Sequence, residues 1–230
     1  MELSIKCPDC GKMLKVTVTA DETPKVTLTK KTESDTSWFD IAADKSKREI
    51  GDEVSCVLKN GEPATFVVAA LNPYEENEAF FVIRDCIGDD KPMNDDCTNE
   101  GGWSKSKMRK YLNEDIWNLL PDDLNAVIKP RKLHTKDTDL DTEDNLWLLS
   151  RMEVFGKESG AEVGDVHFPL FKTEKDRVKV NADGETWCYW LRSPHTANSA
   201  IFWYVSTSGS GNHNYRHAYN SYGVAFGFKI

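Results

Sequence analysis

Two short stretches near the start of the chain alternate between apolar and polar residues. KVTVTA (15–20) and KVTLTK (25–30) have a period of two, and the DETP sequence between them (21–24) is a turn signal. The pattern predicts a two-stranded β-hairpin, which is too small to be stable alone unless it packs on another element or is held by a metal. We assign residues 1–46 to an N-terminal segment that contains the hairpin and a charged linker.

Three strand-like runs follow in the middle of the chain. SCVLK (55–59), ATFVVAAL (64–71) and AFFVIRD (79–85) are rich in β-branched and aromatic residues, and Asn-Gly and Asn-Pro turn signals separate them. Short connections of this kind join neighbouring strands of opposite direction. The runs therefore predict consecutive antiparallel strands at the start of a second domain, which we place at residues 50–230.

The period then changes to that of a helix. Residues 103–120 can place their apolar side chains on one face of a helix or of a broken pair of helices. Ser104 is the expected N-cap, and Pro121 is expected to end the run. LWLLS (146–150) predicts a short buried strand, and Ser150 can cap the turn that follows it.

The C-terminal segment has a different texture. AIFWYVST (200–207) and VAFGFKI (224–230) predict strands, with a Gly-Ser-Gly turn at 209–211 between them. Between residues 190 and 230 the charged residues are Arg192, Arg216 and Lys229, with no aspartate or glutamate. This segment carries +3, which leaves −12 for the rest of a chain whose formal net charge is −9.

Composition excludes several classes of protein. The 230 residues include 39% hydrophobic and 10% aromatic residues, enough for a folded core rather than a disordered chain. The acidic balance argues against a nucleic-acid binder, and no apolar run is long enough to span a membrane. The first residues lack a basic stretch followed by an apolar one, so we expect no signal peptide and a cytoplasmic or virion-associated location.

Six cysteines are expected to be thiols, since nothing indicates a secretory context. Cys56 and Cys86 lie in or at the end of strand-like runs and are expected to be small buried hydrophobes. Cys7 and Cys10 in CPDCGK have the spacing of a zinc knuckle, but no second pair follows. Either Cys7 and Cys10 bind zinc with ligands from elsewhere, or they form a reduced loop without any cofactor.

KDTDLDTEDN (136–145) places three aspartates at alternate positions, as a calcium-binding EF-hand loop does. The match then fails, because Thr142 and Leu148 stand where that loop needs glycine and a bidentate glutamate. The segment is interpreted as a solvated acidic loop, with a loose calcium site as the alternative.

Catalytic motifs are absent from the sequence. There is no nucleophile elbow, phosphate-binding loop or helical metal-binding pair of histidines. His213 and His217 would face the same side of an extended strand, but their segment has no carboxylate to orient either ring. We therefore expect them to be surface contact residues rather than catalytic ones, and we expect no enzyme activity.

Asn, Ser, Gly, Tyr and His, which antibody-like binding surfaces favour, crowd the C-terminal segment. A polar sheet edge with loops would look similar, but dense aromatics and missing solubilising charges favour recognition. The expected ligand-binding residues are Asn198, Phe202, Tyr204, Asn212, His213, Asn214, Tyr215, Arg216, His217, Tyr219 and Asn220. The expected supporting core consists of Trp187, Trp190, Leu191, Trp203, Val224 and Phe228.

Several motifs together resemble a bacterial and phage domain family of uncharacterised function. Members of that family have W-L-R-S-P, then an Asn/Ser/Tyr-rich stretch, and end in Y-G-V-R-P-A; this chain has WCYWLRSP (187–194) and SYGVAFGFKI (221–230). GGWSKSKMRKYLNEDIWNLLP (101–121) and LWLLSRMEVFG (146–156) are similar to its other signatures. The family in turn resembles the C-type lectin fold of formylglycine-generating enzymes and of the variable proteins of diversity-generating retroelements.

The resemblance implies a mixed, mainly antiparallel α+β domain with about two helices, whose C-terminal strands present a ligand-binding face. The lectin calcium motifs are missing, and Ala225 stands where the family often has arginine. Formylglycine-generating enzymes use a copper-binding cysteine pair, whereas the C-terminal half here offers Cys188 alone. The resemblance therefore implies neither calcium-dependent sugar binding nor oxidase activity.

Retroelement mutagenesis of adenines in AAY codons cannot produce Glu, Lys, Gln, Met or Trp. None of these five types occurs between Tyr204 and Phe228, although Glu and Lys are common elsewhere and Gln is absent throughout. The leading hypothesis is a non-catalytic ligand- or receptor-binding protein with a variable surface, whose partner is a protein or cell-surface structure. The alternatives are a degenerate formylglycine-generating-enzyme-like enzyme centred on Cys188 and a phage structural or assembly protein; the oligomeric state stays open.

Overall fold

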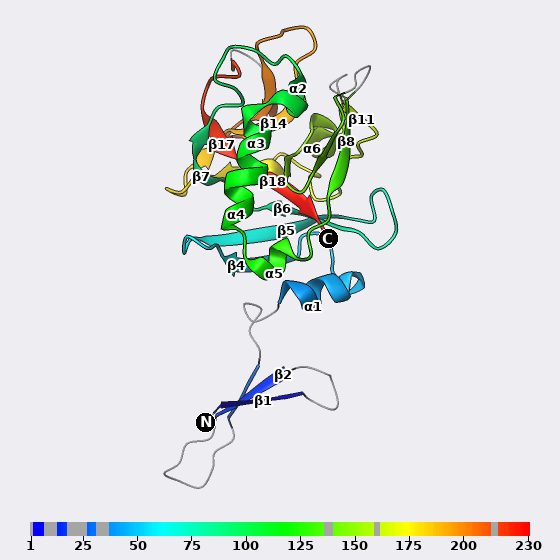
Figure 1. The fold of residues 1–230 in the computed structure, drawn as a ribbon, viewed down its shortest axis with the longest axis vertical. Coiled ribbons are helices and arrows are strands. Elements are labelled where there is room, and N and C mark those ends of the chain that lie inside the picture. Colours follow the sequence, from blue (N-terminus) through cyan, green and yellow to red (C-terminus); the bar gives the residue numbers. More distant parts are fainter. Residues whose placement is uncertain are drawn as a thin grey trace.

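Figure 1 shows the fold in a computed structural model, which describes residues 2–6, 13–17, 27–30, 37–135, 140–158, 162–212 and 216–230. The described chain is mixed α+β, and its sheets are mostly antiparallel, as the sequence predicts. None of the described helices is long and apolar enough to cross a membrane.

The first sheet contains the predicted hairpin and one strand more. Strands β1 (Glu2–Lys6), β2 (Met13–Thr17) and β3 (Thr27–Lys30) pair in that order, with all neighbours antiparallel. Leu14 lies opposite Lys30 and Thr17 opposite Thr27, which confirms that the two alternating stretches pair. The candidate zinc ligands Cys7 and Cys10 lie outside the described residues.

The main sheet has the order β10-β18-β6-β5-β4. Its strands are β4 (Glu53–Val57), β5 (Pro63–Leu71), β6 (Ala79–Ile83), β10 (Trp147–Leu148) and β18 (Phe226–Lys229). The three predicted consecutive antiparallel strands are confirmed as β4, β5 and β6. Every residue of β6 is buried, because the strand lies between two others and is covered on both faces.

Helix α1 (Trp38–Ala43) is capped by Ser37, whose hydroxyl accepts a hydrogen bond from the Phe39 amide. The Trp38 ring contacts Phe66, Phe81 and Phe228 of the main sheet edge-on, at centroid distances of 5.4–5.8 Å. Such contacts stabilise a core beyond the area that they bury. Trp38 therefore belongs to the main core, although it precedes residue 46.

The second five-stranded sheet has the order β16-β15-β14-β17-β7. Its strands are β7 (Ile87–Lys91), β14 (Tyr189–Pro194), β15 (Phe202–Val205), β16 (Gly211–Asn212) and β17 (Tyr222–Val224). The β14–β17 pair is parallel, and the other pairs are antiparallel. Of the predicted supporting core, Trp190, Leu191, Val224 and Phe228 are buried, whereas Trp187 and Trp203 are half-buried.

Of the two forms predicted for 103–120, one helix or a broken pair, the structure has the broken one, and its pieces are separated after Lys105. They are α2 (Gly102–Lys105), α3 (Lys107–Tyr111), the π-helical turn η3 (Leu112–Ile116) and α4 (Trp117–Leu119), followed after Pro121 by α5 (Asp122–Asn125). The prediction of Ser104 as N-cap is wrong, because Ser104 lies inside α2. Ser106 starts the next piece, and its hydroxyl accepts a hydrogen bond from the Arg109 amide.

The remaining elements are short. A three-stranded sheet contains β8 (Arg131–Thr135), β9 (Thr142–Asp144) and β11 (Glu162–Val163), and a two-stranded one contains β12 (Lys179–Val180) and β13 (Thr186–Trp187). Helix α6 (Arg151–Phe155) and the 3-10 turns η2 (Lys45–Lys47) and η4 (Lys175–Arg177) complete the described elements.

Candidate functional site

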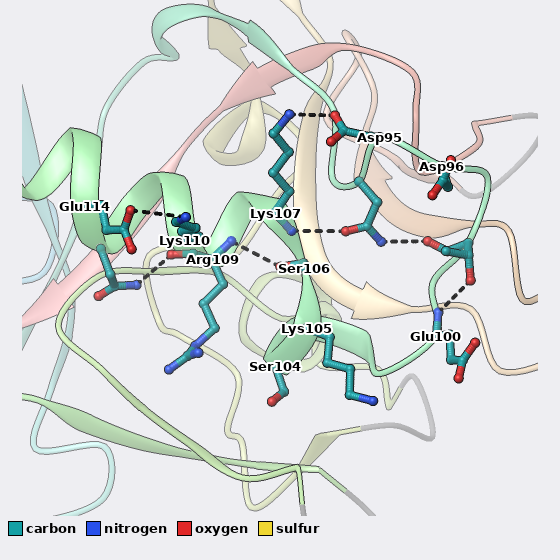
Figure 2. Close-up of a pocket in the computed structure, with 13 residues that line it drawn as sticks. Asp95, Asp96, Glu100, Ser104, Lys105, Ser106, Lys107, Arg109, Lys110 and Glu114 are labelled. Atoms are coloured by element: carbon teal, nitrogen blue, oxygen red, sulfur yellow. Dashed lines mark hydrogen bonds and ion pairs between the residues drawn. The ribbon is translucent and has the colours of Figure 1, made fainter.

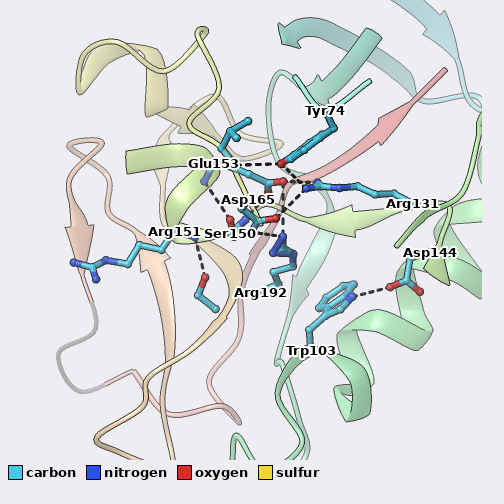
Figure 3. Close-up of polar contacts among 11 residues, drawn as sticks. Tyr74, Trp103, Arg131, Asp144, Ser150, Arg151, Glu153, Asp165 and Arg192 are labelled. Carbon is cyan, nitrogen blue, oxygen red and sulfur yellow. Dashed lines mark hydrogen bonds and ion pairs between the residues drawn. The ribbon is translucent and has the colours of Figure 1, made fainter. Parts of the chain in front are cut away.

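Four charged side chains meet in the interior, where Figure 3 shows them converging from separate elements. We call Arg131, Glu153, Asp165 and Arg192 the ionic cluster; each side chain is at most 7% exposed. Asp165 bridges the two arginines, at 2.9 Å from Arg131 Nη2 and 2.5 Å from Arg192 Nη2, and Arg131 also pairs with Glu153. Two positive and two negative charges balance, as burial requires.

Local sequence explains how the ionic cluster is positioned. Ser150 and Glu153 form a capping box at the start of α6, in which each side chain binds the other's backbone amide. The Ser193 hydroxyl accepts a hydrogen bond from the Arg151 amide at 2.8 Å, which ties β14 to the same helix end. The LLS and LRSP motifs, 40 residues apart in the chain, therefore meet in one structural support.

Electrostatics fix the protonation of Asp165 and of its neighbour Tyr74. Burial tends to raise the pKa of Asp165, but the guanidinium groups of Arg192 and Arg131 outweigh it and hold that pKa below its usual value. Burial, together with Glu153, raises the pKa of Tyr74, whose hydroxyl accepts a hydrogen bond from Arg131. The lowered pKa keeps Asp165 ionised and the raised pKa keeps Tyr74 neutral near pH 7, which is typical of a structural support rather than of a proton-transfer site.

Three loops that are distant in the sequence come together above the second sheet. We call residues 94–100, 195–201 and 216–221 the loop face. The buried Asn99 amide nitrogen lies 2.7–3.1 Å from the carbonyl oxygens of His195, Asn198 and Ile201, sharing two N–H groups among three acceptors. The Asn94 backbone amide donates a hydrogen bond to the Ala218 carbonyl at 3.0 Å. Loop 94–100 therefore binds both of the other loops.

The exposed part of the loop face contains an imidazole between a thiol and a phenol. His217 Nδ1 lies 3.2 Å from the sulfur of exposed Cys97, and the His217 ring stacks on Tyr219 with a centroid distance of 5.5 Å. The Asn220 side chain accepts a hydrogen bond from the His217 amide at 2.8 Å. This geometry fixes the position of the imidazole on the surface.

The predicted binding residues divide into several groups. Asn198, Arg216 and Tyr219 are exposed, and His217 and Asn220 are half-buried, all of them within the loop face. Asn212 is placed in β16 by its backbone. The predictions for His213, Asn214 and Tyr215 fall outside the described residues.

The prediction that Phe202 and Tyr204 face outward is wrong. Phe202 is 0% and Tyr204 4% exposed. Tyr204 lies opposite Trp190 in the β14–β15 pair and stacks on Tyr222 at 5.5 Å, so its ring is covered by neighbours in its own sheet. AIFWYVST has apolar residues on both faces of the strand. Its pattern therefore does not indicate which face is covered.

Buried Tyr204 still contributes to the surface from below. The Arg216 guanidinium lies over the rings of Tyr222 and Tyr204, 5.0 Å and 5.9 Å from their centroids. Burial raises the pKa of Tyr222 to about 12, so that ring stays neutral under Arg216. The stacked tyrosines thus hold an exposed cation by a cation–π contact.

Trp203 points to the opposite side of β15 from Phe202 and Tyr204, as successive strand residues do. The Arg151 guanidinium carbon lies 3.8 Å from the centroid of the Trp203 ring. The His195 ring stacks on Trp203 with a centroid distance of 5.5 Å. Trp203, which the sequence places in the supporting core, is therefore half-buried under Arg151 and His195.

A polar hollow of about 840 Å³ lies between residues 94–100 and helices α2 and α3 (Figure 2). Its lining contains as many acidic as basic side chains, and Lys107 binds Asp95 at 2.6 Å. Such a balance favours neither anionic nor cationic ligands. Asp96 and Thr98, the neighbours of Cys97 in the chain, line this hollow.

The described residues contain no group of three or more His, Cys, Asp or Glu side chains able to hold a metal. Asp141 of the acidic loop accepts hydrogen bonds from His134 and the Thr135 amide, while Asp137 and Asp139 lie outside the described residues. The described cysteines are free thiols. Burial raises the pKa of Cys56 to about 11 and of Cys86 to about 12, and it also raises that of half-buried Cys188.

Comparison with known protein families gives one match, over residues 77–229, to a family described as Domain of unknown function (DUF6273). The chain belongs to this family. No curated protein and no solved structure matches the chain. The expected resemblance to a domain family of unknown function is thus confirmed, and its links to lectins, formylglycine-generating enzymes and retroelement proteins stay predictions.

The matched region of the DUF6273 family contains the whole ionic cluster and all three loops of the loop face. Trp38 and Tyr74, which pack against the core and the cluster, precede it. Sequence reasoning missed Asn94, Cys97 and Asn99 as parts of the site. The Asn/Asp-rich composition of residues 94–100 predicts a turn, but it carries no signal for the loops that this turn contacts.

Proposed function

We propose that the chain is a non-catalytic binding protein whose loop face contacts a protein or cell-surface ligand. The observation that supports this most directly is that hydrogen bonds order the loop face. The Asn99 side chain binds the backbone of the loop that carries exposed Asn198, and the Asn94 amide binds the carbonyl of Ala218, between Arg216 and Tyr219. A contact surface that is ordered before binding loses less entropy when its partner arrives. Tyrosine and arginine are also the residue types that dominate binding hot spots.

The same proposal includes a C-type-lectin-like fold and a surface diversified by a retroelement, in a phage or bacterial context. Its support is the ordered set of sequence motifs and the residue types between 204 and 228. Exposed positions such as Thr207, Ser208 and Ser221 lie in turns between buried strands, so variation there could change the surface and leave the core intact. A reverse transcriptase gene beside a near-copy of these codons, differing at adenines, is the expected finding; neighbouring DNA without either would contradict diversification.

An enzymatic role centred on Cys188 receives less support. The thiolate is the nucleophilic form of cysteine, and burial raises the pKa of Cys188, which opposes its formation. The phage assembly alternative rests on the N-terminal segment, most of which lies outside the described residues. We therefore retain the binding function.

The binding proposal can be tested with the labelled full chain against intact bacterial cells and an array of bacterial surface glycans and proteins. The double variant Arg216→Ala/Tyr219→Ala should weaken saturable binding at least tenfold, about 1.4 kcal/mol. Phe39→Ala is the matched control, because Phe39 is 55% exposed on α1, at the other end of the body from β14 and β17 (Figure 1). Equal affinities for the double variant and the unaltered chain would contradict the proposal.

A further inference from the structure

Cys97 and His217 are 120 residues apart in the chain, yet Cys97 Sγ lies 3.2 Å from His217 Nδ1. Their backbones are held beside each other rather than meeting by chance contact of long side chains. The Asn94 side chain donates a hydrogen bond to the carbonyl of Thr98 at 2.7 Å and accepts one from the backbone amide of Lys107 at 3.1 Å. The backbone amide of Asn94 donates to the carbonyl of Ala218. The residues adjoining Cys97 and His217 are thus fixed to each other.

Cys97 differs from the other described cysteines in its surroundings. Cys56, Cys86 and Cys188 are half-buried, and burial raises the pKa of each of them. Cys97 is exposed and has an imidazole at hydrogen-bonding distance. An imidazole that takes the proton of a neighbouring thiol leaves a thiolate, which is the reactive form of cysteine.

We propose that Cys97 is a nucleophilic thiol, activated by His217, that forms mixed disulfides with low-molecular-weight disulfides. The imidazole takes the thiol proton, and the Cys97 thiolate attacks one sulfur of the disulfide. The S–S bond of the disulfide breaks as the new one forms, and the leaving thiolate takes the proton back from His217. One disulfide replaces another, so no further oxidant is needed.

The neighbouring groups determine how strongly the imidazole must act. Asp95 and Asp96 precede Cys97 and repel a thiolate, but Lys107 pairs with Asp95 at 2.6 Å. The protonated His217 ring is then a cation in direct contact with the sulfur, while its stacking on Tyr219 and the Asn220 contact keep it in place. This chemistry does not depend on the proposed binding function.

The experiment uses the full chain, glutathione disulfide as the probe at pH 7, and mass spectrometry of peptides to locate the adduct. An ordinary thiol is about 3% thiolate at pH 7. A thiol that is about half ionised at this pH has about 16-fold more thiolate, but each thiolate is about fivefold less nucleophilic, so activation is worth about threefold in rate. We expect Cys97 to react about three times faster in the unaltered chain than in His217→Asn. Alkylation of Cys97 by iodoacetamide should slow by a similar factor.

Two references separate activation from exposure. His134→Asn removes an exposed imidazole that pairs with Asp141 rather than with a thiol, and it should change the rate by less than about 1.5-fold. The synthetic peptide NDDCTNE (94–100) contains the same thiol without His217 and should react about three times more slowly than Cys97 in the folded chain. Because this peptide needs no folding, it decides the question even if His217→Asn is unstable. A peptide that reacts as fast as Cys97 in the folded chain would overturn the proposal. Adducts at Cys7 and Cys10 do not affect this comparison, because the rate is measured at Cys97.

Discussion

The ionic cluster and the loop face are both polar, but their polar groups are satisfied in different ways. In the ionic cluster, four charged side chains bind one another and are almost completely removed from water. In the loop face, a buried amide binds main-chain carbonyls, and the charged and aromatic side chains are left for solvent or a partner. The first region uses most of its hydrogen-bonding capacity internally, with Arg192 Nε and Nη1 as buried donors that have no hydrogen-bond partner among the described residues. The second region keeps its side chains available for a partner.

This difference shows which sequence motifs carry structure and which carry recognition. Ser150, Glu153 and Arg192 belong to the most recognisable motifs of the chain, and all of them serve the interior. The exposed Arg216 and Tyr219 lie in a stretch without a distinctive motif. A strongly patterned polar residue is therefore better evidence of a scaffold here than of a site.

The largest expected effect comes from breaking the ionic cluster. Glu153→Ala leaves Arg131 and Arg192 with Asp165 as their remaining carboxylate and also removes the capping box of α6. Removing one partner of a buried ionic group costs about 3–5 kcal/mol, because the remaining charge is not solvated. Urea unfolding should show this loss, and the exposed carboxylate change Glu185→Ala should cost less than about 0.5 kcal/mol. A loss below about 1 kcal/mol for Glu153→Ala would mean that the cluster is not a support.

Acid should weaken the ionic cluster through Asp165. Its pKa is lowered in the folded chain, so the folded state binds fewer protons than the unfolded state below about pH 4. The stability that Asp165 contributes is complete above that pH and is lost as the pH falls through the lower folded value. The difference in unfolding free energy between the unaltered chain and Asp165→Asn should therefore be constant from pH 7 to 5 and shrink towards pH 2. A difference that persists unchanged at pH 2 would contradict the ionic interpretation.

Much of the fold follows from local patterns. The antiparallel strands β4 to β6 match their predicted runs within about two residues, because period-two alternation and turn residues act locally. The sequence predicts the cap at Ser104 rather than at Ser106, because both serines precede a helical stretch. Long-range contacts accompany the break after Lys105, since the Lys107 amide binds the Asn94 side chain and the Met108 amide binds the Met93 carbonyl. Nothing in the pattern could tell which of the two serines would lie at that break.

Contacts between distant loops are harder to predict. Tyr204 was expected outside because tyrosine favours binding surfaces, but Trp190 and Tyr222 cover it. The Cys97–His217 contact joins two loops that are 120 residues apart in the chain, and no periodic pattern in the sequence indicates it. Such a pairing follows from the strand topology. Composition can therefore indicate which segment carries the candidate site, but not which side chains in it contact one another.

A smaller effect should follow from loosening the loop face at its anchor. Asn99→Ala removes the two N–H donors that three carbonyls share, which at about 1 kcal/mol each costs about 2 kcal/mol. Hydrogen exchange should accelerate for the amides of residues 195–201 and stay unchanged in β5 and β6. Uniform acceleration across the chain would instead make Asn99 part of the global core and weaken the distinction between the two regions.

The smallest expected effect on stability comes from Arg216, which forms a matched pair with Arg192. Arg216 is exposed and lies over Tyr204 and Tyr222, so Arg216→Ala should lower the unfolding free energy by about 0.5–1 kcal/mol. Arg192→Ala removes a buried partner of Asp165 and should cost several times more. Unfolding curves of the two variants, measured side by side, test whether equal chemistry has unequal roles in the two regions. If Arg216→Ala costs as much as Arg192→Ala, the exposed arginine is a structural support, and the loop face loses the group best placed to contact a partner.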